Sequence, residues 1–214
     1  LYRPSISAVA RLHTLASIRP LDGPEFLARL RYPTYFSDLI LQSSQQHNLD
    51  PLFVFALIEQ ESLFEGFATS YAAAQGLMQI IPDTGQWIAQ KLSWPNYQNS
   101  DVYRPYINVE YGIFYLSWVM DQVQQLPYAA LAGYNGGHGV IKRGWATWAS
   151  ETQRYYYWGT RIYAEAVSGM ETSPTLDEWL NAGGWTLCSR ASQRPSAMSE
   201  PSTIRWSKGP GQPQ

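Results

Sequence analysis

The chain has 214 residues, with 15 Lys and Arg against 17 Asp and Glu, and a formal net charge of −2. A near-neutral chain offers no electrostatic attraction for nucleic acid or for an anionic membrane surface, so neither is a predicted partner. Charged residues make up 15% and aromatic residues 14% of the chain, which argues against intrinsic disorder for most of it.

Helical patterns follow one another along the chain. The expected helices span residues 5–16, 25–30, 32–46, 52–63, 72–80, 82–92, 107–124, 127–132, 151–167 and 174–181. The clearest start is Asp50-Pro51, because aspartate caps helices and proline suits the first helical position. No stretch alternates as a strand and no internal repeat is visible, so the predicted fold class is all-α.

The composition changes twice along the chain. Residues 1–31 are expected to form a helical lead, 32–188 the main domain, and 189–214 a disordered tail rich in Ser, Arg, Pro, Gly and Gln. The single cysteine, Cys188, excludes an intrachain disulfide and a cysteine-based metal site. No uncharged apolar run reaches the 18 or so residues of a membrane span, and no secretory signal peptide is visible.

Two glutamates end the apolar helix expected at residues 52–63. Glu61 shares a face with Leu57 and Ile58, whereas Glu59 follows the stripe of Phe55. A carboxylic acid on an apolar face can keep its proton near neutral pH, as the general acid of a glycosidase does. Periodicity does not choose between the two glutamates, and both also fit partly exposed ends of a core helix.

Four short blocks follow in order: Glu-Ser at 61–62, Gly-Leu-Met-Gln-Ile at 76–80, Ala-Gly-Tyr-Asn-Gly-Gly at 132–137 and Glu-Thr-Gln-Arg-Tyr at 151–155. Together they resemble the sequence blocks of lytic transglycosylases, above all the catalytic domain of the soluble group, over about residues 32–166. The resemblance implies a lysozyme-like, goose-type-like helical domain with a deep substrate cleft for residues 32–188.

The resemblance also implies roles for individual residues. The glutamate directly before serine is the family's catalytic acid/base, which here is Glu61. Substrate-binding roles carry over to five further residues: Ser70, Gln79, Tyr134, Asn135 and Glu151. Met78 is expected in the core, and Ser62 is expected to bond back to the helix backbone.

The segment 66–82 after Glu61 contains no Asp or Glu, which favours a reaction with a single acid over the usual pair of carboxylates. The resemblance implies cleavage between N-acetylmuramic acid and N-acetylglucosamine in peptidoglycan strands, with 1,6-anhydromuramoyl products, outside the cytoplasmic membrane. No cofactor is expected, and the scattered His13, His47 and His138 show no metal-ligand spacing. A lysozyme-type hydrolase of peptidoglycan or chitin and a catalytically inactive glycan-binding domain are the alternatives.

Overall fold

The computed structural model describes residues 2–18, 23–123, 125 and 127–137, and in this part of the chain it has seven α-helices and one 3-10 helix. They are α1 Tyr2–Ala16, α2 Glu25–Arg31, α3 Ser37–Gln46, α4 Pro51–Ser62, α5 Pro82–Lys91, η1 Asn99–Tyr103, α6 Pro105–Gln122 and α7 Pro127–Gly136. The described ranges contain no β-strand, only two isolated β-bridges, Thr69–Gln75 and Gln75–Ile80. The predicted all-α class is confirmed for this part of the chain.

Helix α4 begins where the Asp50-Pro51 pair predicts. The Asp50 side chain accepts a hydrogen bond from the Leu52 backbone N–H at 2.8 Å, and Pro51 occupies the first turn. Burial of Asp50 raises the pKa of its carboxyl, and the backbone hydrogen bonds that it accepts oppose that rise. The helix ends at Ser62, and the next residue, Leu63, caps it with a left-handed φ of 53°.

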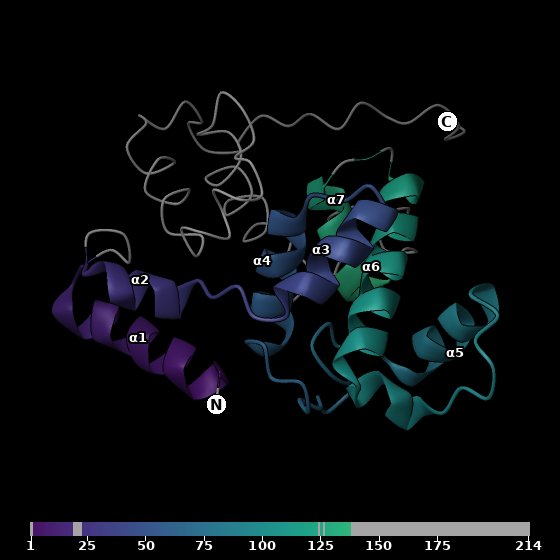
Figure 1. Ribbon diagram of the computed structural model, residues 1–214, viewed down its shortest axis with the longest axis horizontal. Coiled ribbons are helices and arrows are strands. Elements are labelled where there is room, and N and C mark those ends of the chain that lie inside the picture. The colour runs from purple at the N-terminus through teal and green to yellow at the C-terminus, as the bar shows by residue number, and fades with distance from the viewer. Residues whose placement is uncertain (1, 19–22, 124, 126, 138–214) are drawn as a thin grey trace, which may run out of the picture.

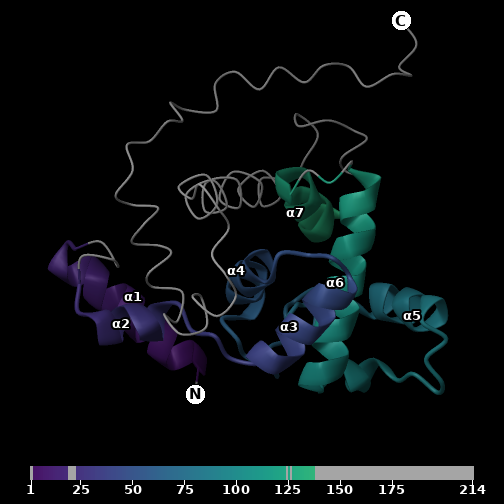
Figure 2. The ribbon, with the colours of Figure 1, turned by 45° about the horizontal axis from the view of Figure 1, so that its top comes forward.

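Helices α3 to α7 form the main helix group. Helix α6 is the longest of the described helices and runs through the middle of this group, between α3 and α5 (Figures 1 and 2). It contacts α3, α5, α7 and η1. Helix α6 is buried along most of its length, through residues that include Ile107, Val109, Ile113, Leu116 and Val119. The core of the described residues therefore forms around α6. Side chains on different sides of this helix contact different neighbouring elements.

Helices α1 and α2 form a pair beside the main group (Figures 1 and 2). The Tyr2 ring stacks on Tyr35 with a centroid distance of 3.8 Å, and Tyr35 meets Phe64 edge-on at 5.8 Å. The lead thus packs against the segment before α3, and Tyr35 connects that segment to Phe64, which follows α4. A domain boundary at residue 31 stays a prediction.

The helix predicted over residues 72–80 is wrong, because this segment forms consecutive turns. Ser70 and Ala74 close one turn through a hydrogen bond of 2.9 Å, and Gln75 and Ile80 exchange two backbone hydrogen bonds of 3.0 Å. Gly76 has a φ of +78°, a conformation that glycine adopts readily and that an α-helix excludes.

Other parts of the helix assignment also differ from the prediction. Helix α3 begins at Ser37 and not at Tyr32, because Phe36 takes a left-handed φ of 60° that an α-helix cannot include. Helix α7 continues to Gly136 past the expected end at Ala132, and η1 lies between residues 92 and 107, where no helix was expected. The helices predicted at 151–167 and 174–181 and the tail at 189–214 lie outside the described residues.

Candidate active site

Glu61 lies in the last turn of α4 and is partly exposed. The next residue, Ser62, is 5% exposed, and its hydroxyl donates to the Ile58 carbonyl at 3.2 Å. This confirms the expected backbone bond of Ser62. The hydroxyl of Ser62 is therefore used inside the helix.

Glu59 forms an ion pair with Arg31 of α2. The side chains of Glu59 and Arg31 are 13% and 21% exposed. Burial raises the pKa of Glu59, and the nearby Arg31 guanidinium lowers it by a smaller amount. A raised pKa alone would also fit a catalytic acid, but the Arg31 partner assigns Glu59 to the contact between α2 and α4.

Replacing Arg31 with methionine is expected to lower the free energy of unfolding by about 3 kcal/mol at neutral pH, because a buried carboxylate loses its partner. The pKa of Glu59 then rises further above its ordinary 4.5. A carboxyl with a raised folded pKa stabilises the fold at low pH and loses that contribution as the pH rises through this pKa. The deficit should therefore shrink as the pH falls towards 4.5, which urea unfolding at both pH values would measure.

The matched control is Arg29→Met in the same helix. Arg29 pairs with Glu25 at 2.6 Å, but these side chains are 52% and 54% exposed. An exposed pair contributes only about 0.2–1 kcal/mol. Equal losses for the two variants would contradict the assignment of Glu59 to a buried structural pair.

Ser70 and Gln79 lie at the two ends of the turn segment that follows Phe67. The Ser70 hydroxyl oxygen accepts from the backbone N–H groups of Ala72 at 3.2 Å and Ala74 at 3.0 Å. The Gln79 side-chain amide donates to the carbonyls of Gly76 at 2.8 Å and Ala68 at 3.3 Å. Both predicted residues thus stabilise the conformation of this segment. These bonds do not use the hydroxyl hydrogen of Ser70 or the side-chain oxygen of Gln79.

Asn108 of α6 holds the same segment in place and is itself only 1% exposed. Its oxygen accepts from the Met78 N–H at 2.7 Å, and its nitrogen donates to the carbonyls of Gln75 at 2.9 Å and Val102 at 2.7 Å. Sequence reasoning missed Asn108, although an asparagine inside the apolar run of α6 was the available signal.

Two glycines allow this close approach. A Cβ at Gly76 would lie 2.2 Å from the Asn108 side-chain nitrogen, and one at Gly112 would lie 2.3 Å from the Met78 sulfur. Met78 is completely buried, so the expectation that it belongs to the core is confirmed. The Gly-Leu-Met-Gln block therefore forms a turn that packs closely against α6.

Tyr134 of α7 closes the site from the other side. Its hydroxyl donates to the Met78 carbonyl at 2.8 Å, and its side chain is 9% exposed. Burial raises the pKa of Tyr134 well above 10, and electrostatic interactions with Glu61 and Tyr115 raise it further. The hydroxyl therefore stays protonated, and the charge of Glu61 lies near enough to act on it.

Three of the four sequence blocks thus meet at one place: the end of α4, the Gly76–Ile80 turn and α7. Asn135, next to Tyr134, is partly exposed. Glu151, predicted to bind substrate, lies outside the described residues.

The described residues include no group of three or more His, Cys, Asp or Glu side chains able to hold a metal ion. Among the helices described, none is both long and apolar enough to cross a membrane.

Known sequences identify the family. Residues 38–156 match the family model described as "Transglycosylase SLT domain". The chain is 32% identical over 114 residues to "Membrane-bound lytic murein transglycosylase C" of Glaesserella parasuis, a match that spans 49% of this chain and 31% of the relative. It is 29% identical over 113 residues to "Soluble lytic murein transglycosylase" of Salmonella typhimurium, spanning 52% of this chain and 18% of the relative. The matches thus cover about a third or less of these relatives.

Solved structures show the same fold. A lytic transglycosylase from Pseudomonas aeruginosa, solved as an inactive glutamate-to-glutamine mutant, superposes with a TM-score of 0.58 at 23% identity, covering 81% of this chain and 31% of that one. The 70-kDa soluble lytic transglycosylase of Escherichia coli gives a TM-score of 0.52 at 23% identity, covering 75% and 24%. The predicted lysozyme-like helical fold is confirmed, and the chain belongs to the family of proteins with a transglycosylase SLT domain.

Proposed function

We propose that this chain is a lytic transglycosylase domain that cleaves peptidoglycan strands between N-acetylmuramic acid and N-acetylglucosamine, with Glu61 as its single acid and base. The observation that carries the proposal is the position of Glu61, at the end of α4, near Tyr134. A negative charge on Glu61 raises the pKa of the Tyr134 phenol, whose hydroxyl donates a hydrogen bond of 2.8 Å to the carbonyl of Met78. The names of the murein transglycosylase relatives agree with this activity.

The proposed reaction returns Glu61 to its starting state. Protonated Glu61 gives its proton to the glycosidic oxygen, and the bond from this oxygen to C1 of the muramoyl sugar breaks. The muramoyl N-acetyl group stabilises the positive charge at C1, as in substrate-assisted glycosidases. The C6 hydroxyl oxygen then attacks C1 and gives its proton to the Glu61 carboxylate. The products are a 1,6-anhydromuramoyl end and a free hydroxyl on N-acetylglucosamine.

Substrate contacts are proposed for Ser70, Gln79, Tyr134, Asn135 and Glu151. For Gln79 the side-chain nitrogen bonds to backbone carbonyls, so we assign the side-chain oxygen to a sugar hydroxyl or amide. For Ser70 the oxygen accepts two backbone bonds, so we assign its hydroxyl hydrogen to the sugar. In both residues, the hydrogen bonds to the backbone that stabilise the turn also orient the group assigned to the sugar.

Exposed aromatic rings flank this turn segment. Phe67 and Tyr71 are 78% and 97% exposed, and Phe67 stacks on Tyr103 with a centroid distance of 6.1 Å. Exposed apolar surface beside a polar site is typical of ligand-binding surfaces. We therefore place the glycan strand along this segment. Because peptidoglycan lies outside the cytoplasmic membrane, we also propose an extracytoplasmic location.

Digestion of purified peptidoglycan in water enriched with oxygen-18 tests the reaction. Mass spectrometry is expected to find anhydro products, each lighter than a hydrolysis product by one water and free of the heavy isotope. Labelled reducing ends would instead establish a lysozyme-type hydrolase. Binding to peptidoglycan without any product would establish an inactive glycan-binding domain.

A further inference from the structure

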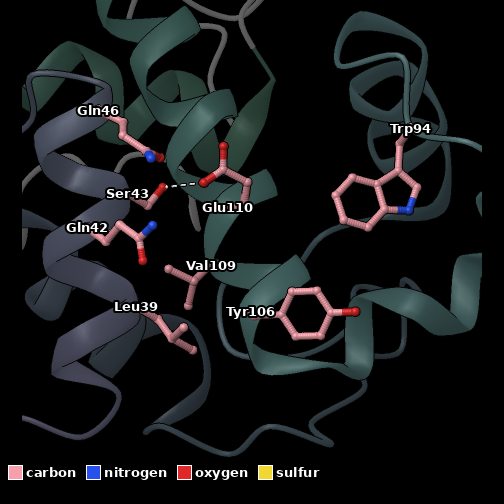
Figure 3. A pocket seen from close by; sticks show the side chains of 8 residues that line it. All are labelled: Leu39, Gln42, Ser43, Gln46, Trp94, Tyr106, Val109 and Glu110. Atoms are coloured by element: carbon pink, nitrogen blue, oxygen red, sulfur yellow. Dashed lines mark hydrogen bonds between the residues drawn. The ribbon is translucent and has the colours of Figure 1, made fainter.

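A cavity of about 190 Å³ lies between α3 and α6 and is bounded on its far side by Trp94 (Figure 3). Gln42, Ser43 and Gln46 line it from α3, and Tyr106 and Glu110 line it from α6. Leu39 and Val109 add apolar surface. Known pockets for drug-sized ligands occupy about 300–1,000 Å³, so this cavity suits one functional group of a larger ligand.

The cavity is separate from the candidate active site. Asn108 and Gly112 of α6 face the Gly76–Ile80 turn, as their contacts with Met78 show. Glu110 is two residues from each of them, and two residues correspond to more than half a helical turn. Glu110 therefore projects from the other side of α6, towards α3 (Figure 3).

The Glu110 carboxylate is held in a defined position. One oxygen accepts from the Ser43 hydroxyl at 2.7 Å, and the other lies 3.2 Å from the His47 ring nitrogen. Ser43 is 4% exposed, whereas the Glu110 side chain is 31% exposed. A carboxylate offers about four acceptor positions, so these two contacts leave capacity for a further donor.

The remaining lining groups indicate the kind of donor. Figure 3 shows the amide groups of Gln42 and Gln46 on the side of Glu110, and the rings of Trp94 and Tyr106 across the opening. Among the described lining residues there is neither Lys nor Arg. Carboxylate and amide oxygens accept hydrogen bonds from an ammonium group, and aromatic rings attract cations. An anionic ligand finds no matching charge here.

We propose that this cavity binds a primary ammonium group at the end of an alkyl chain, namely the free side-chain amine of a diamino acid in the peptide stems of peptidoglycan. The identity of this ligand rests on the proposed function, whereas the ammonium chemistry rests on the cavity alone. The ammonium group bonds to Glu110 and the glutamine oxygens, and the alkyl chain packs against Leu39 and Val109. Such a contact holds a substrate strand on a face that the active site does not use.

Co-sedimentation with peptidoglycan tests this site in a Glu61→Gln background, which prevents cleavage. Adding Glu110→Gln keeps the shape and removes the charge. The affinity for native peptidoglycan is expected to fall about three- to tenfold, between the effects of an exposed and a buried charge pair. Binding to peptidoglycan with chemically acetylated amines should already be weaker, and Glu110→Gln should not weaken it further.

The matched control is Asp38→Asn, an exposed carboxylate in the first turn of α3, the helix that faces Glu110, and it should leave binding unchanged. Unchanged binding to native peptidoglycan in Glu110→Gln would overturn the proposal, as would an equal loss for native and acetylated material. Calorimetry with Nα-acetyl-lysine and its Nε-acetylated derivative tests the ammonium chemistry alone. Binding of the first compound that is independent of Glu110 would also overturn it. Amine-dependent binding by a chain that forms no anhydro products would retain this site and reject the proposed reaction.

Discussion

Replacing Glu61 with glutamine is expected to lower the rate of anhydro-product formation by about 10²–10⁴-fold, the usual contribution of a positioned acid or base. Glutamine keeps the size and the hydrogen-bonding oxygen of glutamate, but it can neither donate the proton to the glycosidic oxygen nor take one from the C6 hydroxyl. Both halves of the proposed reaction therefore fail together. Initial rates on soluble peptidoglycan fragments, with product masses, measure the effect.

The matched controls are two carboxylates that follow Glu61 in the sequence. Glu65 is one helical turn beyond Glu61 in sequence, and Asp83 lies in the first turn of α5. In a single-acid reaction, Glu65→Gln and Asp83→Asn should retain most of the wild-type rate. A loss in either control as large as that in Glu61→Gln would indicate a second catalytic carboxylate, and a hydrolase would then be the better hypothesis.

Helix starts were predicted well where the residues that mark the start also make the stabilising contact within the same helix. The Asp50-Pro51 start of α4 and the Pro82 start of α5 both depend on residues within the first turn. The same is true of Ser62, whose hydroxyl bonds to a residue four positions earlier. Capping and backbone bonds of this kind are visible in a window of a few residues.

The turn at residues 72–80 was not predictable in this way. Its run of alanines has a high helical propensity, but the polar groups that hold it open come from Asn108, which is 30 residues or more away in sequence. Two long-range hydrogen bonds to a buried side chain outweigh a preference of a few tenths of a kcal/mol per residue.

The choice between Glu59 and Glu61 had a similar cause. Both residues follow apolar helix faces, and periodicity treats them alike. The difference lies in Arg31, which pairs with Glu59 from 28 residues earlier. Family resemblance favoured Glu61 without using this contact, and the catalytic role of Glu61 stays a prediction until the glutamine variant is measured.

Replacing Asn108 with leucine is expected to lower the free energy of unfolding by about 3–6 kcal/mol. The Met78 N–H and the carbonyls of Gln75 and Val102 lose their partner, and each unsatisfied buried group costs about 1–3 kcal/mol. The greater apolarity of leucine offsets part of this loss. Domains are commonly stable by about 5–15 kcal/mol, so the variant should unfold at a much lower urea concentration.

The matched control is Gln122→Leu, which makes the same kind of change at an exposed position of α6 and should alter stability by less than about 0.5 kcal/mol. Where Asn108→Leu is still folded, its activity should also fall, because the Gly76–Ile80 turn carries both Gln79 and the Met78 carbonyl that holds Tyr134. A stability loss no greater than in the control would mean that water replaces the asparagine. If stability falls but the activity of the folded fraction does not, the turn keeps its shape without Asn108, and the side chain contributes to the fold alone.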